Sequence, residues 1–447
     1  MDPTVDYFSR GLRLEVRAER PGGGPPRVRT IEYGRRAITV RNTGDGDVER
    51  YTLTGDDLKG LLHPPRALCA AWDGEKLRIG PAVAIYALPF PGKNLFGPQT
   101  AMFAEMSELC KRSGCDLYVV TPGSLHLADG VVDGYRIHER EWRKQPCPWP
   151  DFVWRRLTVR PEIWARQLDE DERLIAGSNT HVGTLARSGN DKWQVFRALR
   201  GDPRTARHLP ETVLVHSPQE AARVTDRFDD MYVKPIRGTQ GQGVMRVRKT
   251  AAGFLVAPPS AAGGRMAGAP MKDAAELSSA LGRRMGPRQA YLAQETVQVM
   301  RTAAGRPFDL RILVQALADG STACTAVVAR VGRPGAVTTN LHTGGVPVSV
   351  LTLTSLLAHD GRRTFARAAV AARDAALAAF DVLAELHPHL MELGVDIALN
   401  ANGNAYILEV NPCPGRRMLR QIDPALRRMS LVRVVEYAVF SAGFRPL

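Results

Sequence analysis

A lysine followed by three closely spaced glycines is the first feature of this sequence that suggests chemistry. Lys234 ends the apolar run Tyr232–Pro235, and Gly238, Gly241 and Gly243 follow it. Glycines let backbone N–H groups converge on a phosphate without obstruction by Cβ, and the lysine adds a point charge. The spacing fits neither a P-loop nor a Rossmann fingerprint. The segment predicts a phosphate-binding hairpin, with a flexible turn beside an ordinary lysine as the alternative.

Two carboxylates and an amide form a second candidate site. Asp396 lies in the apolar run Val395–Leu399, and Glu409 and Asn411 lie in and just after the run Ala405–Val410. If the two runs pair as a hairpin, the three side chains reach one end and one face. Their oxygens suit Mg²⁺ that bridges ATP phosphates. The alternative is the solvent face of an edge strand, but the apolar neighbours of Glu409 favour a buried strand.

Arginines supply two weaker candidates. Arg311 opens a buried run with Asp309 two residues before it, which indicates either an orienting ion pair or a contact to a γ-phosphate. Arg330 precedes a loop that holds Asn340, His342 and paired glycines, and this loop is typical of anion binding. A lone histidine is usually structural, so we do not predict His342 to be a catalyst.

Short strands and an α/β unit are expected before these motifs. Residues 1 to 80 alternate between apolar and polar positions with Gly/Pro turns, which predicts a β-rich module. From Pro81, a buried strand at Val83–Leu88, a helix at Met102–Lys111 and a strand at Asp116–Val120 predict a parallel α/β unit. The run Pro146–Pro150 is too rich in proline to predict regular structure.

The second half must position the motifs. Ala257–Pro270 is expected to be a surface loop or the tip of a mobile subdomain. The alanine-rich pattern of Thr364–Leu386 predicts a long amphipathic helix. The other predicted elements are a helix at Asp191–Leu199 and strands at Thr212–Val215, Tyr232–Pro235, Val244–Arg248, Tyr291–Gln294, Leu310–Ala316 and Cys324–Val331.

Composition limits the class of protein. A chain of 447 residues predicts two or three packed units, and 44% apolar and 24% charged residues are globular values. No apolar run approaches a membrane span, the start lacks signal-peptide features, and the six cysteines show no zinc spacing. The net charge of +14 favours anionic partners, yet 6% aromatics and diffuse charge argue against nucleic acid. A cytoplasmic location is the expectation.

Taken in order, these segments resemble the ATP-grasp superfamily, and most closely its YheC/YheD-like branch of endospore coat-associated proteins. The resemblance spans roughly Pro81 to the C-terminus, and the second half also resembles the ribosomal-protein glutamate ligases. One departure from the branch is Cys413, which stands where the branch usually has a lysine or a similar residue. The carrying segments are Asn190–Trp193, Leu209–Thr212, the Lys234 loop, Phe308–Arg311, Thr339–Gly345, Leu393–Asp396, Leu408–Asn411 and Pro414–Arg416.

The resemblance implies an α/β fold of the ATP-grasp type and assigns roles by position. It implies an N-terminal module at 1–80, a pre-ATP-grasp domain at 81–185 and an ATP-grasp domain at 186–447, divided into 186–295 with the lid and 296–447 with the metal site. Arg311, Arg330 and Asn340 would face the γ-phosphate or an acyl-phosphate. Asp396, Glu409 and Asn411 would hold Mg²⁺, with two ions expected. The implied ATP-binding residues are Lys192, Lys234, Gly238, Thr239, Gln240, Gly241, Gly243, Gln294 and Glu295.

The implied activity is ATP-dependent ligation of a carboxylate to an amine through an acyl-phosphate. The partners would be a small-molecule, peptide or protein carboxylate and an amine acceptor. Two alternatives stay open: a phosphotransferase with the same ATP site, and a nucleotide-binding coat or scaffold protein without turnover. The resemblance also allows a location in the mother-cell cytoplasm or at the spore coat.

Overall fold

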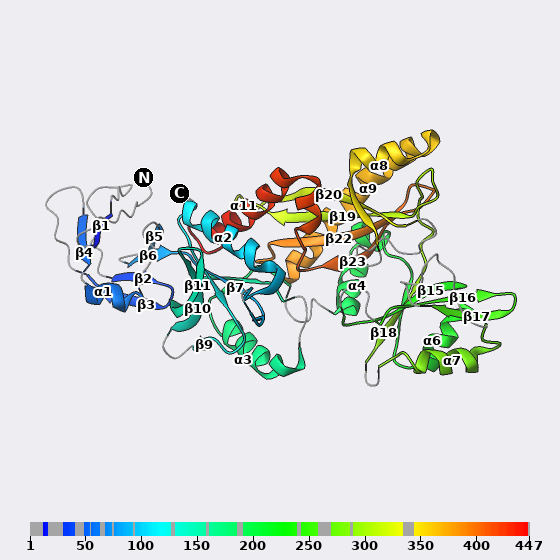
Figure 1. Ribbon diagram of the computed structural model, residues 1–447, viewed down its shortest axis with the longest axis horizontal. Coiled ribbons are helices and arrows are strands. Elements are labelled where there is room, and N and C mark those ends of the chain that lie inside the picture. The colour runs from blue at the N-terminus through cyan, green and yellow to red at the C-terminus, as the bar shows by residue number, and fades with distance from the viewer. Residues whose placement is uncertain are drawn as a thin grey trace. The chain divides into compact units, whose positions relative to one another are not determined.

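The computed structural model describes most of the chain as two compact units. The first comprises Met1–Thr184, Ala316–Ser321 and Met429–Leu447, and the second comprises Leu185–Gln315 and Thr322–Arg428 (Figure 1). The described residues are 12–16, 30–40, 49–53, 55–62, 68–73, 76–92, 94–126, 130–157, 161–185, 191–238, 243–257, 270–286, 289–333 and 344–445. No helix in these ranges is long and apolar enough to cross a membrane.

Two small sheets begin the first unit, at the positions where the sequence alternates. One sheet has the strand order β3-β2-β6-β5, and β1 pairs with β4 in the other. Alternation buries Ile31 and Tyr33 on one face of β2. The elements are β1 (Leu12–Val16), β2 (Thr30–Tyr33), β3 (Arg36–Thr39), β4 (Glu49–Leu53), α1 (Gly55–Gly60), β5 (Cys69–Asp73) and β6 (Lys76–Gly80).

A larger sheet follows, with the order β11-β10-β8-β7-β12-β13 and with β9 paired to β10. β7 is parallel to both β8 and β12, and α2 connects β7 to β8, which confirms the predicted parallel α/β unit. Every residue of β7 and β8 is buried, as expected for strands covered on both faces. The elements are β7 (Ala82–Tyr86), α2 (Thr100–Arg112), β8 (Asp116–Val120), β9 (Leu125–His126), β10 (Val131–His138), β11 (Glu141–Pro148), β12 (Phe152–Arg155), α3 (Ala165–Ala176) and β13 (His181–Val182).

The proline-rich segment is a correction to the sequence prediction. Pro146 and Pro148 lie inside β11, opposite Asp133 and Val131 of β10. β11 stands at the end of the strand order, so no strand of the described ranges pairs with its other side. Proline, which lacks an N–H, is tolerated on such an edge.

The second unit begins with an antiparallel sheet of order β14-β18-β15-β16-β17. Met231 and Val233 of β15 form a buried cluster with residues of α6 and α7, including Ala221 and Leu277. Because side chains alternate along a strand, Lys234 points to the opposite face. The elements are α4 (Lys192–Gly201), α5 (Pro203–Ala206), β14 (Thr212–Val215), α6 (Pro218–Arg223), β15 (Asp230–Pro235), β16 (Met245–Thr250), β17 (Gly253–Ala257), α7 (Ala274–Gly282) and β18 (Tyr291–Glu295).

A second sheet, of order β21-β20-β19-β22-β23, completes this unit. The long helix α9 packs on β20, β22 and β23, and its Phe365 meets Phe308 of β19 edge to face, with ring centroids 6.0 Å apart. Its alanines, among them Ala372 and Ala376, are buried. The elements are β19 (Phe308–Ala316), β20 (Thr322–Val331), β21 (Val346–Ser349), α8 (Val350–Leu356), α9 (His359–Leu386), β22 (Glu392–Leu399), β23 (Ala405–Asn411) and α10 (Arg417–Ile422). The last helix, α11 (Pro424–Ser441), starts in this unit and belongs to the first unit from Met429 on.

Candidate functional site

A row of ion pairs crosses the face of the second sheet opposite α9. Phe308 points to α9. Because side chains alternate along a strand, Asp309 and Arg311 of β19 point to the other face of the sheet. Arg330 donates from Nε and Nη2 to Asp309, at 2.7 and 2.6 Å. The same Nη2 lies 3.1 Å from Oδ2 of Asp396. Arg311 donates to both carboxylate oxygens of Asp396, one at 2.8 Å.

The ion pairs decide one of the alternatives that the sequence left open for Asp309 and Arg311. Asp309 binds Arg330 rather than Arg311, two residues along its own strand. Residues i and i+2 of a strand are separated by about 6.6 Å, whereas neighbouring strands lie about 4.8 Å apart. Arg311 stands opposite Asp396 in the register and pairs with it across the sheet. Burial alone would raise the pKa of Asp396, but Arg311 and Arg330 hold it below its ordinary value.

The three predicted metal ligands lie at one end of the β22–β23 hairpin. Asp396 stands opposite Glu409, and Asn411 stands opposite Gly394. Between Asp396 and Ile397 the register shifts by one residue, a bulge that bends the strand and re-aims its side chains. The hairpin therefore places both carboxylates and the amide in the half that lies away from its turn, and their binding of a metal stays a prediction.

The burial of Glu409 differs from the prediction. β23 is an edge strand, and the Glu409 side chain is 45% exposed. Only Ala405 and Ile407 of this strand are fully buried. The helix α9 packs on one face of the strand, and the opposite face, which carries Glu409, does not contact α9. Its cationic partner is Lys192, whose Nζ lies 3.4 Å from Oε1. Asn411 accepts a hydrogen bond from the N–H of Cys413 through Oδ1, at 3.0 Å, and this contact shapes the loop after the strand.

Lys234 joins the two sheets of the second unit. Its Nζ donates to Oε1 of Gln294 at 2.8 Å and to the carbonyl of Leu408 at 3.2 Å. Leu408 is the residue that the bulge leaves out of the register, so its carbonyl is available to the lysine. Burial lowers the pKa of Lys234 to about 8, with Glu409 opposing the shift and Lys192 adding to it. Nearby phosphates would favour the charged form.

Lys192, in the first turn of α4, also lies beside Glu409. Asp191 caps this helix by accepting hydrogen bonds from the N–H groups of Trp193 and Gln194. The Nζ of Lys192 donates to the carbonyl of Gly238 at 2.6 Å. The two predicted ATP lysines therefore lie around one carboxylate, Glu409, together with the start of the glycine segment.

Gln294 and Glu295 end β18 in different environments. Gln294 is buried and donates from Nε2 to Thr212 at 2.9 Å while it accepts from Lys234. Glu295 is exposed, and its backbone N–H binds the carbonyl of Glu211 at 2.9 Å. The role in ATP binding that the resemblance implies for both residues stays a prediction.

Two glycines border the predicted phosphate loop with backbones that favour glycine. Gly238 has φ of +145° and Gly243 has φ of +70°, both in the region that L side chains rarely adopt. Thr239, Gln240, Gly241 and Asn340 lie outside the described residues.

The arrangement fits a polyanion with a divalent cation. Among the described residues, these four cations (Lys192, Lys234, Arg311 and Arg330) face three carboxylates, those of Asp309, Asp396 and Glu409, which leaves one excess positive charge. Two carboxylates and an amide at one hairpin end are hard oxygen donors of the kind that Mg²⁺ takes. Within the described ranges no three His, Cys, Asp or Glu side chains gather around one point. The candidate ligand set needs only two such residues, since Asn411 supplies the third oxygen.

Two positioning features were missed in the sequence. A Cβ on Gly394 would lie 3.0 Å from Cβ of Pro414 and 3.3 Å from Cδ of Arg311, so glycine lets both pack there. Arg416 forms a fully buried ion pair with Glu392 and donates from Nη1 to the carbonyl of Pro414 at 2.8 Å. The signals were a glycine two residues before Asp396 and a glutamate that begins an apolar strand.

Comparison with known proteins identifies the family of residues 184–440. Residues 184–440 match the family described as YheC/D like ATP-grasp, which is more than half of the chain. The chain is also 26% identical over 391 residues to the endospore coat-associated protein YheD of Bacillus subtilis (strain 168), covering 85% of this chain and 83% of that protein.

Solved structures resemble the chain more distantly. D-cycloserine synthetase DcsG matches with a TM-score of 0.46 and 14% identity, over 79% of this chain and 98% of that one. D-alanyl-alanine synthetase A from Vibrio cholerae O1 biovar eltor str. N16961 matches with a TM-score of 0.47 and 10% identity, over 80% and 97%.

Proposed function

Because this chain belongs to the YheC/D-like ATP-grasp family, we propose that it ligates a carboxylate to an amine at the expense of ATP. One observation supports the proposal most. Four cationic side chains and a carboxylate–amide hairpin end converge on one region of the second unit, with Lys192 and Lys234 both beside Glu409. Such a site favours transfer of the γ-phosphoryl group to a carboxylate, a reaction carried by positioning and charge neutralisation.

The proposed reaction has two steps. A carboxylate oxygen of the substrate attacks the γ-phosphorus, the bond to the bridging oxygen breaks, and ADP leaves with an acyl-phosphate behind. The amine then attacks the carbonyl carbon, phosphate leaves with the electron pair of the C–O bond, and the nitrogen loses a proton. This chemistry needs no nucleophilic serine, cysteine or histidine.

We assign each residue a role from its position in the site. Lys192 and Lys234 would hold the ATP phosphates, and Arg311 would neutralise charge on the transferring group from its place beside Asp396. Asp396, Glu409 and Asn411 would hold Mg²⁺, which when bound offsets phosphate charge. Residues 186–295 and 296–447 remain our proposal for the two parts of the ATP-grasp domain.

The structure refines the role proposed for Arg330. Its guanidinium is buried and held by Asp309 and Asp396. Burial lowers the pKa of Arg330, but these two carboxylates more than compensate and raise it. We therefore propose that Arg330 acts by fixing Asp396 rather than by touching phosphate.

The test is a turnover assay with product analysis. Purified full-length protein is incubated with Mg-ATP, pooled carboxylic acids and pooled amines, and nucleotides are separated by chromatography. ADP and phosphate that appear only with both acid and amine support the ligase. AMP and pyrophosphate contradict it, and ADP with a stable phosphorylated acceptor indicates the phosphotransferase. Binding of ATP without turnover on any pool would favour the nucleotide-binding coat or scaffold protein.

A further inference from the structure

A buried ion pair lies directly after the loop that follows Asn411. The side chains of Arg416 and Glu392 are 3% and 0% exposed. Removing two charges from water offsets most of the free energy that their attraction returns, so a buried pair often adds little net stability. One use of such a pair is to fix a single conformation, because either charge left alone would be costly. The other contacts of Arg416 indicate which conformation it fixes.

The pair is tied to three neighbouring strands. Thr325 of β20 donates to Oε1 of Gln315 in β19 at 2.7 Å. Gln315 in turn donates from Nε2 to Oε2 of Glu392, which stands opposite it in β22, at 3.3 Å. The same Oε2 accepts a hydrogen bond from Nη2 of Arg416. All four side chains are buried, so this network holds Arg416 firmly against the sheet.

The pair and the candidate site stand on the same face of the same two strands. Arg311 and Gln315 both belong to β19 and lie four residues apart. Their partners across β22 are Asp396 and Glu392, in that order. Side chains an even number of residues apart share a face of a strand. The anchor of Arg416 is therefore separated from the ion pair of the site by about 13 Å along the strands.

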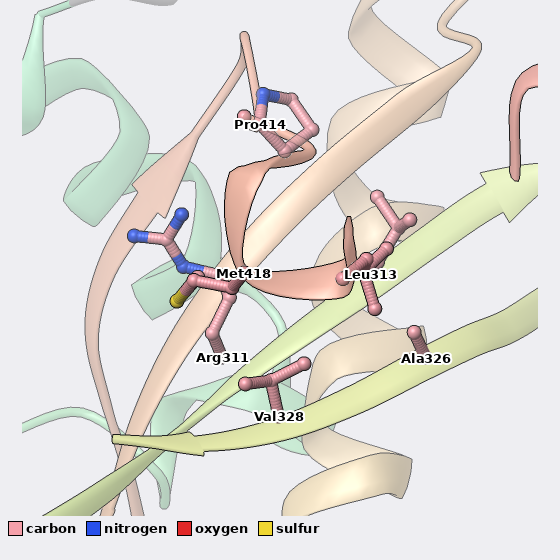
Figure 2. A pocket seen from close by; sticks show the side chains of 8 residues that line it. Arg311, Leu313, Ala326, Val328, Pro414 and Met418 are labelled. Carbon is pink, nitrogen blue, oxygen red and sulfur yellow. The ribbon is translucent and has the colours of Figure 1, made fainter. Parts of the chain in front are cut away.

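The loop of residues 412–415 lies between the anchor and the site. Arg416 donates from Nη1 to the carbonyl of Pro414 at 2.8 Å. Pro414 packs over Gly394, where an added Cβ would come within 3.0 Å of the proline Cβ. Figure 2 shows Pro414 and Met418 on the segment that passes over β19, the strand of Arg311. Arg416 and Gly394 together seat this loop on the strands of the site.

Asn411 holds the other end of the loop. Its Oδ1 accepts a hydrogen bond from the N–H of Cys413 at 3.0 Å. This bond fixes which end of the amide is the oxygen, because the NH₂ group cannot accept. An amide oxygen accepts twice, so Oδ1 can bind Cys413 and a metal ion at once. The orientation of Asn411 thus depends on the path of the loop, and that path depends on Arg416.

We propose that Arg416 is a positioning residue for the metal site. It holds the loop 412–415 against β22 and thereby keeps Asn411 in the orientation in which Oδ1 binds Mg²⁺. Groups that orient a metal ligand affect metal affinity although they do not touch the ion. The inference rests on the proposed function and adds to it a residue outside the proposed ligand set.

The test removes the pair without leaving a buried charge alone. Arg416→Met/Glu392→Gln does this, and the introduced amide still accepts the hydrogen bond from β19. Arg136→Met/Asp116→Asn is the matched control, because it removes the buried pair of the first unit, in which Arg136 donates to Asp116 at 2.6 Å. Both variants lose one buried ion pair, but only the first loses a contact to the loop after Asn411.

Calorimetric titration with ATP in Mg²⁺ and in EDTA measures the effect on the metal without turnover. We expect the Kd for Mg-ATP to rise about tenfold in Arg416→Met/Glu392→Gln, while the Kd for ATP in EDTA changes by less than about twofold. The control should change both constants by less than about twofold, even where its melting temperature falls as far. An unchanged Kd for Mg-ATP in Arg416→Met/Glu392→Gln overturns the inference.

A mutant cycle shows whether Arg416 acts through Asn411. Asn411→Ala should itself raise the Kd for Mg-ATP about tenfold, and the combined variant should bind less than about twofold more weakly than that. Losses that multiply in the combined variant contradict the inference, because Arg416 would then act on another part of the site.

Gly394→Ala covers the case in which the substituted pair does not fold. The added Cβ displaces Pro414 and leaves the ion pair in place, so Mg-ATP should again bind several-fold more weakly. Normal affinity for Mg-ATP in this variant overturns the inference alone. If the unmodified protein binds ATP equally well in Mg²⁺ and in EDTA, the proposed metal site and the inference both fail. If it does not bind ATP at all, the proposed function fails with them.

Discussion

The Nζ of Lys192 lies 3.4 Å from Oε1 of Glu409, which joins the first turn of α4 to the edge strand β23. The lysine also binds the carbonyl of Gly238 at 2.6 Å. Lys192 thus contacts both a proposed metal ligand, Glu409, and the first residue of the glycine segment, Gly238. On the proposed function, Mg-ATP would recruit Glu409 to the metal and Lys192 to phosphate, so we expect this ion pair to separate when the nucleotide binds.

Glu409→Gln should abolish the part of the ATP effect that depends on magnesium. In the unmodified protein, a ligand at about 100 times its dissociation constant adds ~2.7 kcal/mol to the free energy of unfolding. Melting curves with ATP in Mg²⁺ and in EDTA separate the two contributions. The variant should melt alike in both solutions, because an amide replaces a carboxylate ligand. Glu108→Gln is the control, since Glu108 also pairs with a lysine, Lys111, and both side chains lie exposed on the surface of α2. A full magnesium effect in Glu409→Gln would remove Glu409 from the ligand set.

The lowered pKa of Lys234 predicts that, as pH rises, ATP affinity falls while the free energy of unfolding rises. Burial lowers its pKa from 10.5 to about 8 in the folded protein. Metal-free ATP in EDTA should bind about tenfold more weakly for each pH unit above about 8, because the charged ammonium is lost. Between pH 8 and 10.5 the unfolded chain binds more protons, so the free energy of unfolding of the nucleotide-free protein should rise with pH.

Calorimetric titration with ATP and urea unfolding across this pH range measure both trends. Lys234→Met is the control, since it should flatten each of them. If ATP affinity stays constant from pH 7.5 to 9.5 in the unmodified protein, Lys234 does not contact the phosphates in its charged form.

The hairpin could be predicted from the sequence because its signals are local. Alternating apolar residues and a polar turn define β22 and β23, and i, i+2 spacing places Glu409 and Asn411 together. The strand order is not local. It decides that Asp309 meets Arg330, and that β23 lies at an edge where Glu409 is half exposed.

The bulge at Leu408 and the edge strand β11 could not be predicted from the sequence for the same reason, because both depend on how strands assemble into a sheet. A one-residue shift at Leu408 follows from how β22 and β23 fit together, and no residue type announces it. The prolines of β11 argue against a strand until the neighbours are known, since only an edge position tolerates them. Periodicity therefore predicts elements, while the contacts of the site depend on their assembly.

Substitution of Arg330 should mainly lower the free energy of unfolding, whereas substitution of Arg311 should mainly lower kcat. Arg330→Met removes the guanidinium from two buried carboxylates, and we expect a loss of about 3–5 kcal/mol in the free energy of unfolding. Arg311→Met should cost less, because Asp396 keeps Arg330 and the Arg311 side chain is partly exposed. Its kcat should nevertheless fall about 100-fold or more, as when one transition-state donor is removed. Urea unfolding and steady-state kinetics on both variants test this division. Equal destabilisation by the two substitutions would contradict it.

Gly238 should matter for ATP through its backbone. With φ of +145° it occupies a conformation that an L residue adopts only with strain, of order 1–3 kcal/mol. Gly238→Ala should relieve that strain by moving the peptide whose carbonyl accepts from Lys192. Lys192 then loses its anchor, so the KM for ATP should rise about tenfold.

The fold should tolerate the change, because Gly238 is exposed at the end of β15. Gly201→Ala is the control, since its surroundings are open and its backbone is unstrained. Within the loop itself, Gly241→Val should impair ATP use more than Thr239→Ala, because the backbone and not the side chain would approach phosphate. Steady-state kinetics and hydrogen exchange with and without Mg-ATP distinguish the outcomes. A Gly238→Ala protein with a normal KM, or equal exchange in both states, would make this segment an ordinary turn.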